Sequence, residues 1–196
     1  MRIKLMVSLM TALVAFAGIA GAAVYEVDAS HSSVEFKIKH LVVSNVRGAF
    51  DSFTVETMEF DGEDPANWTV SATIDAASID TGNQDRDDHL RGEDFLDVDN
   101  HPQITFVSVA IQPSEDGLYA MHGDLTLHGV TKRIVLDLEH NGTVEDPWGG
   151  TRSGFTATGE IDRRDFGLTW NKAIEAGGVV VGNEVKITLE IEAIRK

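Results

Sequence analysis

Residues 185–192 alternate apolar and polar side chains at every position, the cleanest such pattern in the chain. A period of two places alternate side chains on opposite faces of a β-strand, so the apolar face must be covered. The pattern recurs along the chain and restricts the fold to a mainly antiparallel β-sheet protein with one buried face. Further strands are predicted at residues 34–38, 50–60, 68–74, 104–111, 118–128, 134–138, 155–161 and 179–181.

Turn residues separate these segments at regular intervals and give roughly eight strands with one helical insertion. This is the pattern of a β-sandwich or an up-and-down barrel. The strands on either side of Gly129 form a predicted hairpin, and Gly48 indicates a bulge or a close backbone approach. Five residues can share one face of the hairpin: Leu125, Leu127, Ile134, Leu136 and Leu138. Periodicity leaves open whether a barrel interior would be filled or would hold one ligand.

The stretch at residues 81–91 is the least strand-like part of the chain and mixes Asn, Arg, Asp and His. Thr81 and Gln84 have the spacing of a capping box. They predict a short helix that starts near Asn83 and ends by Gly92. Leu90 is expected to turn toward the core.

Charged groups in this insertion are candidates for acid–base chemistry. Arg86, Asp87 and His89 are the relevant residues. The chain has no Gly-x-Ser-x-Gly elbow, cysteine, phosphate loop or dinucleotide fingerprint. We therefore expect no catalytic residues and no enzyme, with Arg86 and Asp87 paired to hold the insertion. The alternative is a hydrolase or isomerase that uses Asp87 and His89.

Seven histidines raise the question of a metal site. No two of them lie three or four residues apart on a predicted helix, and residues 97–101 lack the glycine and distal glutamate of a calcium loop. The sequence therefore predicts neither a bound metal nor a cofactor.

The first 22 residues have the features of a secretory signal peptide. Arg2 and Lys4 precede an apolar run, and small residues up to Ala22 supply a cleavage site. We expect cleavage near Ala22, a periplasmic location, and one domain at residues 23–196. The absence of cysteine means that no disulfide supports the exported fold.

The chain is strongly acidic, with 32 acidic and 16 basic residues. Loss of Arg2 and Lys4 would leave 14 basic residues and a net charge of −18. Such a protein is repelled by phosphate backbones, so nucleic-acid binding is not expected. No second apolar run reaches the ~20 residues of a membrane span, and we expect a monomer or homodimer that is not membrane-embedded.

Several segments together resemble the YceI-like family of polyisoprenoid-binding, lipocalin-like proteins, over essentially all of the chain after the leader. The matching segments are residues 31–36 with His40, 46–50, 78–83 with Arg86, Asp87, His89 and Leu90, 94–95, 102–106, 123–132, 146–149, and Arg163 with 165–168. The resemblance implies an extended eight-stranded antiparallel barrel with a short helical insertion and a long apolar tunnel that holds an isoprenoid chain. Members are typically exported and have no established catalytic activity.

On this resemblance, the expected function is to enclose an isoprenoid-tailed amphiphile, a quinone or polyprenyl lipid, for transport, storage or sequestration. Aromatic residues expected around the tail are Phe36, Phe50, Phe95, Phe106, Phe155, Phe166 and Trp170. Residues expected to hold the head group are His40, Arg47, Asn83, Arg86 and His89. The acidic net charge favours an uncharged head group unless Arg47 and Arg86 converge on it. A third hypothesis is a structural partner protein whose barrel is filled by its own side chains.

Overall fold

The computed structural model describes residues 23–60, 64–173 and 179–196. The predicted signal peptide lies outside these ranges, and so do Gly177 and Gly178, whose sequence predicts a turn before the strand at residues 179–181. The strands are β1 (Ala23–Val27), β2 (Ser33–His40), β3 (Ser44–Phe50), β4 (Phe53–Phe60), β5 (Thr69–Asp75), β6 (Ile79–Asp80), β7 (Gln103–Pro113), β8 (Tyr119–Leu127), β9 (Val130–Glu145), β10 (Thr151–Asp162) and β11 (Val181–Arg195). The helices are α1 (Gln84–Arg91) and five 3-10 turns, η1 (Ala29–His31), η2 (Pro65–Asn67), η3 (Ala76–Ser78), η4 (Glu115–Gly117) and η5 (Arg163–Phe166).

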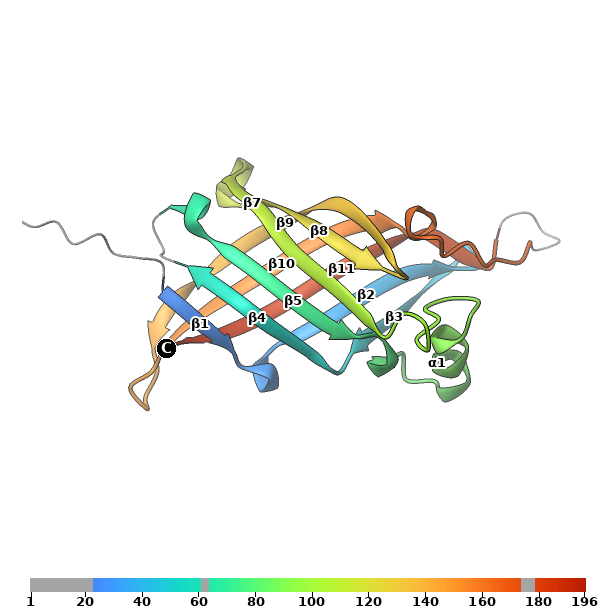
Figure 1. Ribbon diagram of the computed structural model, residues 1–196, viewed down its shortest axis with the longest axis horizontal. Coiled ribbons are helices and arrows are strands. Elements are labelled where there is room, and N and C mark those ends of the chain that lie inside the picture. The colour runs from blue at the N-terminus through green and yellow to red at the C-terminus, as the bar shows by residue number, and fades with distance from the viewer. Residues whose placement is uncertain (1–22, 61–63, 174–178) are drawn as a thin grey trace, which may run out of the picture.

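The sheet closes on itself, which selects the barrel over the sandwich. One edge of β11 pairs with β10, and the other pairs with β2 and then with β1, which also pairs with β4. Strands β1 and β2 together occupy one position around the barrel wall, and strands β3 and β4 together occupy the next position. The closed barrel therefore has eight antiparallel strand positions. The predicted eight-stranded barrel with a short helical insertion is confirmed. Figure 1 shows an elongated barrel with α1 beside one end, which we call the α1 end.

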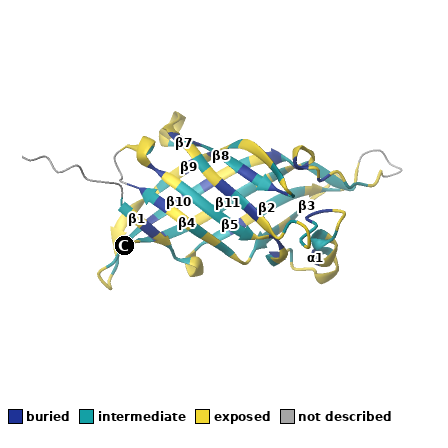
Figure 2. Cartoon of the chain, viewed as in Figure 1, coloured by how far each residue is buried: buried dark blue, intermediate teal, exposed yellow. Residues whose placement is uncertain are grey.

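Side chains alternate between the inside and the outside of the wall, as the period of two predicts (Figure 2). The predicted inward set around the β8–β9 hairpin is confirmed, since all five of its members belong to the core or pack against it. In β7 the alternation holds as far as Val109, with Ile104 and Phe106 buried and Val107 and Val109 exposed. A bulge between Ser108 and Ala110 then shifts the register, so Ile111 is buried although strict alternation would place it on the outer face with Val109.

At two positions in the barrel wall a glycine leaves room for an aromatic ring to lie directly against the strand. At Gly48 the β2–β3 register runs on without a bulge, and a Cβ would lie 2.6 Å from Cζ of Phe36. Of the two alternatives predicted for Gly48, a bulge or a close approach, the structure therefore shows the close approach. A Cβ at Gly123 would lie 2.1 Å from Cζ of Phe106. Because even a methyl group would clash, both positions require glycine for the observed ring placement.

Candidate functional site

The barrel interior at the α1 end contains a cavity of about 350 Å³, within the range of small-molecule sites. Among the described residues, thirty line it, and 24 of these are apolar. The polar lining residues are Glu35, Lys39, His40, Arg86, His89 and Arg163. Several inward residues of the wall, such as Ile187 and Leu189, are only half-buried although they face the interior. An arrangement of this kind can take up an apolar chain.

Five of the seven aromatic residues predicted for the tail meet at this cavity: Phe36, Phe50, Phe95, Phe106 and Trp170. Phe155 and Phe166 are not among its lining residues. Phe166 is 1% exposed in η5, and Phe155 lies in a separate group of aromatic residues. The sequence identified both as inward-facing, but strand periodicity does not show how far along the barrel an inward side chain lies.

The other half of the barrel is filled by rings. We call the group Tyr25, Phe60, Trp68, Tyr119, His140 and Phe155 the aromatic plug. The ring centroids of Phe60 lie 4.5 Å from those of Trp68 and His140 and 5.1 Å from that of Phe155. His140 also stacks on Phe155 at 5.0 Å. The interior is thus divided into a packed half and an open half.

Burial in the aromatic plug lowers the pKa of His140 below its ordinary value, because desolvation disfavours imidazolium. Unfolding therefore takes up a proton between the folded-state pKa and about 6.5. The stability that neutral His140 contributes is present above about pH 6.5 and is lost as the pH falls toward the folded-state pKa. As the pH is lowered from about 8 to about 5, we expect the free energy of unfolding to decrease less in His140→Phe than in the parent protein. Urea titrations at each pH measure the difference. His31→Phe, at an exposed site, is the control; an equal effect there would contradict the assignment.

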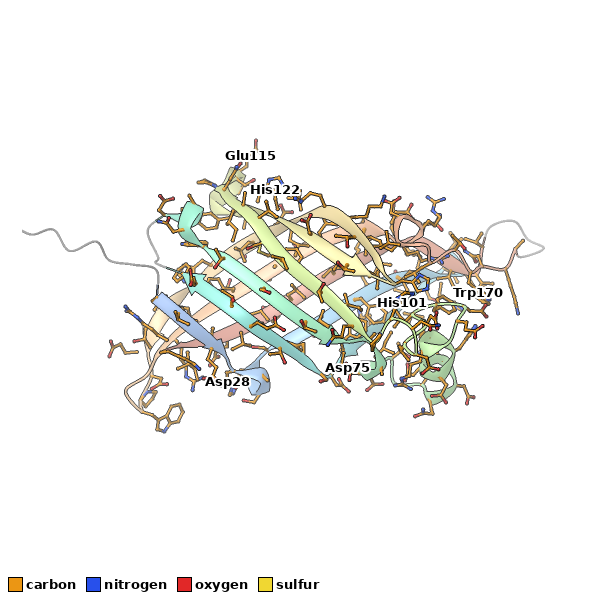
Figure 3. The ribbon with its side chains drawn as sticks, viewed as in Figure 1. Asp28, Asp75, His101, Glu115, His122 and Trp170 are labelled. Carbon is orange, nitrogen blue, oxygen red and sulfur yellow. The ribbon has the colours of Figure 1, made fainter. Side chains whose placement is uncertain are left out.

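Of the residues predicted for the head group, His40, Arg86 and His89 line the cavity. The ring of His89 lies edge-on to Phe95 and Trp170, with both centroids at 5.0 Å, and its Nε2 lies 3.0 Å from Oδ2 of Asp94. Figure 3 shows Trp170 at the same end of the barrel as α1.

Arg47 and Asn83 are not among the cavity-lining residues. Arg47 is exposed on β3, so it does not converge with Arg86 on a head group at this cavity. Asn83 instead caps α1, since its Oδ1 accepts a hydrogen bond from the backbone N–H of Arg86 at 3.0 Å. The predicted helix bounds are confirmed, but the capping box at Thr81 is wrong because Asn83 has the N-cap role.

Thr81 joins the two charged side chains that were expected to pair with each other. Asp87 accepts hydrogen bonds from the Thr81 N–H at 3.0 Å and from its Oγ1 at 2.5 Å. Arg86 donates from Nε to Thr81 Oγ1 at 2.7 Å and from Nη2 to the Thr81 carbonyl at 2.8 Å. Within the described ranges no ion pair joins Arg86 to Asp87. Both residues hold the insertion, but they do so through Thr81.

Asp87 is 4% exposed, so its two hydrogen bonds are sheltered from water. Each hydrogen bond to a charged group contributes roughly 1.5–3 kcal/mol. We expect Asp87→Ala to lower the free energy of unfolding by about 2–4 kcal/mol in urea titrations. Asp85→Ala, on the exposed side of α1, should cost about 0.5 kcal/mol or less. If the two variants were equally stable, Asp87 would not have this structural role.

Arg163 is a cavity-lining residue that was not among the predicted head-group residues. It is 3% exposed, and its guanidinium donates to the carbonyl of Gly182 at 2.8 Å and to the carbonyl of Leu168. Burial lowers the pKa of Arg163, because desolvation disfavours its charged form. No carboxylate pairs with it among the described residues. The only available signal was its place in the matching segment with residues 165–168.

Asp87 and His89 are not brought together as an acid–base pair. Residues two apart on a helix do not face each other. The Asp87 carboxylate is engaged by Thr81, while His89 contacts Asp94. The hydrogen bonds of the described residues therefore do not favour the alternative, a hydrolase or isomerase site at Asp87 and His89.

A closed antiparallel barrel with an apolar cavity at one end belongs to the lipocalin-like class of binding-protein folds. A sequence model described as the YceI-like domain matches residues 25–193, nearly the whole described chain. The protein belongs to the YceI-like family.

Relatives support the same assignment. A UPF0312 protein of Staphylococcus aureus (strain MSSA476) is 41% identical over 166 residues, 84% of this chain and 94% of the relative. A UPF0312 protein of Yersinia pestis (strain Pestoides F) is 40% identical over 186 residues, 94% of this chain and 93% of the relative.

Solved structures share the fold. BcnA of Burkholderia cenocepacia has a TM-score of 0.74 and 27% identity, over 85% of this chain and 99% of its own. A domain from Saccharophagus degradans, described as polyisoprenoid-binding and implicated in plant cell wall breakdown, has a TM-score of 0.63 and 17% identity, over 89% of this chain and 99% of its own. Within the described ranges, no helix is both long and apolar enough to cross a membrane.

Proposed function

We propose that the protein is an exported, non-enzymatic binding protein that encloses the tail of an isoprenoid amphiphile in its cavity. The observation that carries this proposal is a mainly apolar cavity of about 350 Å³ with six polar side chains in its lining, in the half of the barrel that the aromatic plug does not fill. Membership of the YceI-like family and the polyisoprenoid-binding description of the Saccharophagus degradans domain support it. The leader-like sequence at residues 1–22 supports export to the periplasm.

The apolar lining supplies an adequate driving force. At about 0.8 kcal/mol per buried methylene, ten enclosed tail carbons contribute about 8 kcal/mol before the costs of ordering. The cavity suits one segment of a tail, and a longer tail binds with its remainder outside. The open interior also counts against a barrel that serves only as a packed structural partner.

For the head group we propose an uncharged quinone. Arg47 lies away from the cavity, and Arg86 is occupied by Thr81, so these two do not form an anion site. His40, His89 and the buried Arg163 remain as donors to a carbonyl oxygen. The acidic net charge further disfavours a phosphate head group.

Native mass spectrometry of protein extracted gently from an exporting host tests the proposal. We expect one isoprenoid ligand per chain, and delipidated protein should take up an isoprenoid quinone in preference to a polyprenyl phosphate. Protein that emerges without any isoprenoid and binds neither probe would overturn the function. Preference for the phosphate would overturn only the head-group assignment.

A further inference from the structure

We propose that Asp97, His101 and His128 form a site for a divalent metal ion such as Zn²⁺, separate from the apolar cavity. One potential ligand atom from each residue lies within 4.8 Å of the other two, and all three residues are half-buried. None of the three lines the cavity. Two imidazoles and a carboxylate are a donor set that Zn²⁺ favours, and they leave a fourth position for water.

The fold brings these residues together from separate segments. Asp97 and His101 lie in the segment between α1 and β7, and His128 lies in the turn between β8 and β9. The rings of His101 and His128 have their centroids 4.7 Å apart. A Cβ at Gly129 would lie 2.7 Å from Cε1 of His101, so the glycine leaves room for that ring. Figure 3 places His101 at the α1 end.

Two of the donors have neighbours of the kind that orient ligands in metal sites. Nδ1 of His128 lies 3.3 Å from the Phe166 carbonyl. If Nδ1–H donates to that carbonyl, Nε2 keeps its lone pair for a metal, the usual arrangement of a ligating histidine. The Asp97 carboxylate accepts from Nδ2 of Asn100 at 2.9 and 3.0 Å, which fixes its orientation. No hydrogen bond to the His101 ring is present among the described residues.

The distances require only a local adjustment. Ligand atoms around a tetrahedral Zn²⁺ lie about 3.4 Å from one another, given bonds of about 2.0–2.1 Å. Side-chain rotations that move the donors by on the order of 1 Å would close the site. Such a metal would connect the segment before β7 to the β8–β9 turn.

A second cluster provides a contrast. Asp28, His31 and Glu192 also lie within range of a common ion. There, however, Nη1 of Arg152 contacts Asp28 at 2.9 Å and also contacts Glu192, so a guanidinium already neutralises the carboxylates. No cation of the protein takes that position among the described contacts of Asp97, His101 and His128. The two clusters therefore predict opposite behaviour toward added metal.

Calorimetric titration of untagged, chelator-treated protein with zinc chloride tests the site. We expect one equivalent of Zn²⁺ per chain, a raised Tm, and affinity at least 100-fold weaker in His101→Gln and in His128→Gln. His31→Gln is the matched control and should bind as the parent does. The absence of stoichiometric binding, or unchanged affinity in both variants, would overturn the proposal.

Two further measurements distinguish the loss of zinc binding from misfolding of a variant. Asp97→Asn keeps the backbone contacts of this segment, so it should fold and still lose zinc affinity. Circular dichroism of each variant without metal establishes whether the barrel is intact. Should the histidine variants fail to fold, unchanged zinc affinity in Asp97→Asn would overturn the site. Neither measurement involves the isoprenoid ligand, so a negative zinc-binding result would overturn the metal site without affecting the proposed function.

Discussion

Val185→Trp is expected to weaken retention of an isoprenoid ligand by on the order of 100-fold while the barrel stays folded. Val185 lines the cavity from β11 and is only half-buried, so a larger side chain has space to extend inward. An indole that displaces about four tail methylenes removes about 3 kcal/mol of binding free energy, which corresponds to that factor. Fluorescence titration with an isoprenoid quinone measures the change.

Val135→Trp is the matched control for this substitution. Val135 is 46% exposed on β9, so the same change there adds an indole to the outer surface. We expect unchanged affinity in the control. Equal affinities in both variants would place the ligand outside the cavity and would contradict the proposed function.

Phe60→Ala is expected to reduce the free energy of unfolding by about 3–5 kcal/mol, the usual cost of truncating a buried aromatic ring. Phe60 is 4% exposed and contacts Tyr25, Trp68, His140 and Phe155. Its loss leaves a void that the rigid barrel wall cannot close fully. Urea unfolding followed by tryptophan fluorescence and by circular dichroism measures the loss.

The ligand should still bind to the folded fraction of Phe60→Ala, because the aromatic plug and the cavity occupy different halves of the barrel. Val144→Ala, at a residue 63% exposed on β9, should lie within about 0.5 kcal/mol of the parent protein. A cost below about 1 kcal/mol for Phe60→Ala would mean that the plug repacks, contrary to the tight ring contacts.

The strands were largely predictable because they depend on a local pattern. The strand predicted at residues 185–192 lies inside β11, and the hairpin around Gly129 is present. Alternation does not carry past a point where the backbone departs from regular geometry. In β7 strict alternation would place Val109 and Ile111 together on the outer face, but the bulge after Ser108 turns Ile111 inward, and no period-two argument reveals a bulge.

The site was only partly predictable because neighbouring strands decide which inward side chains meet. Phe106 and Phe155 look alike in sequence, yet one lines the cavity and the other stacks on His140. The two positions differ in their depth along the barrel, which depends on the stagger of paired strands rather than on alternation. Arg163 was missed as a site residue because its burial follows from the fold of η5 against β11.

The sequence by itself determined the alternating strands, the apolar interior face, the helical insertion and the family resemblance. The strands and the apolar face follow from local periodicity, and the resemblance follows from ordered motifs. The helix bounds were correct although the predicted capping box was not. Only the tertiary structure decided which half of the interior is packed and which is open, and which distant residues become neighbours. The physical reason is that cavities and side-chain clusters depend on the summed volumes and positions of residues from many strands, which no single segment encodes.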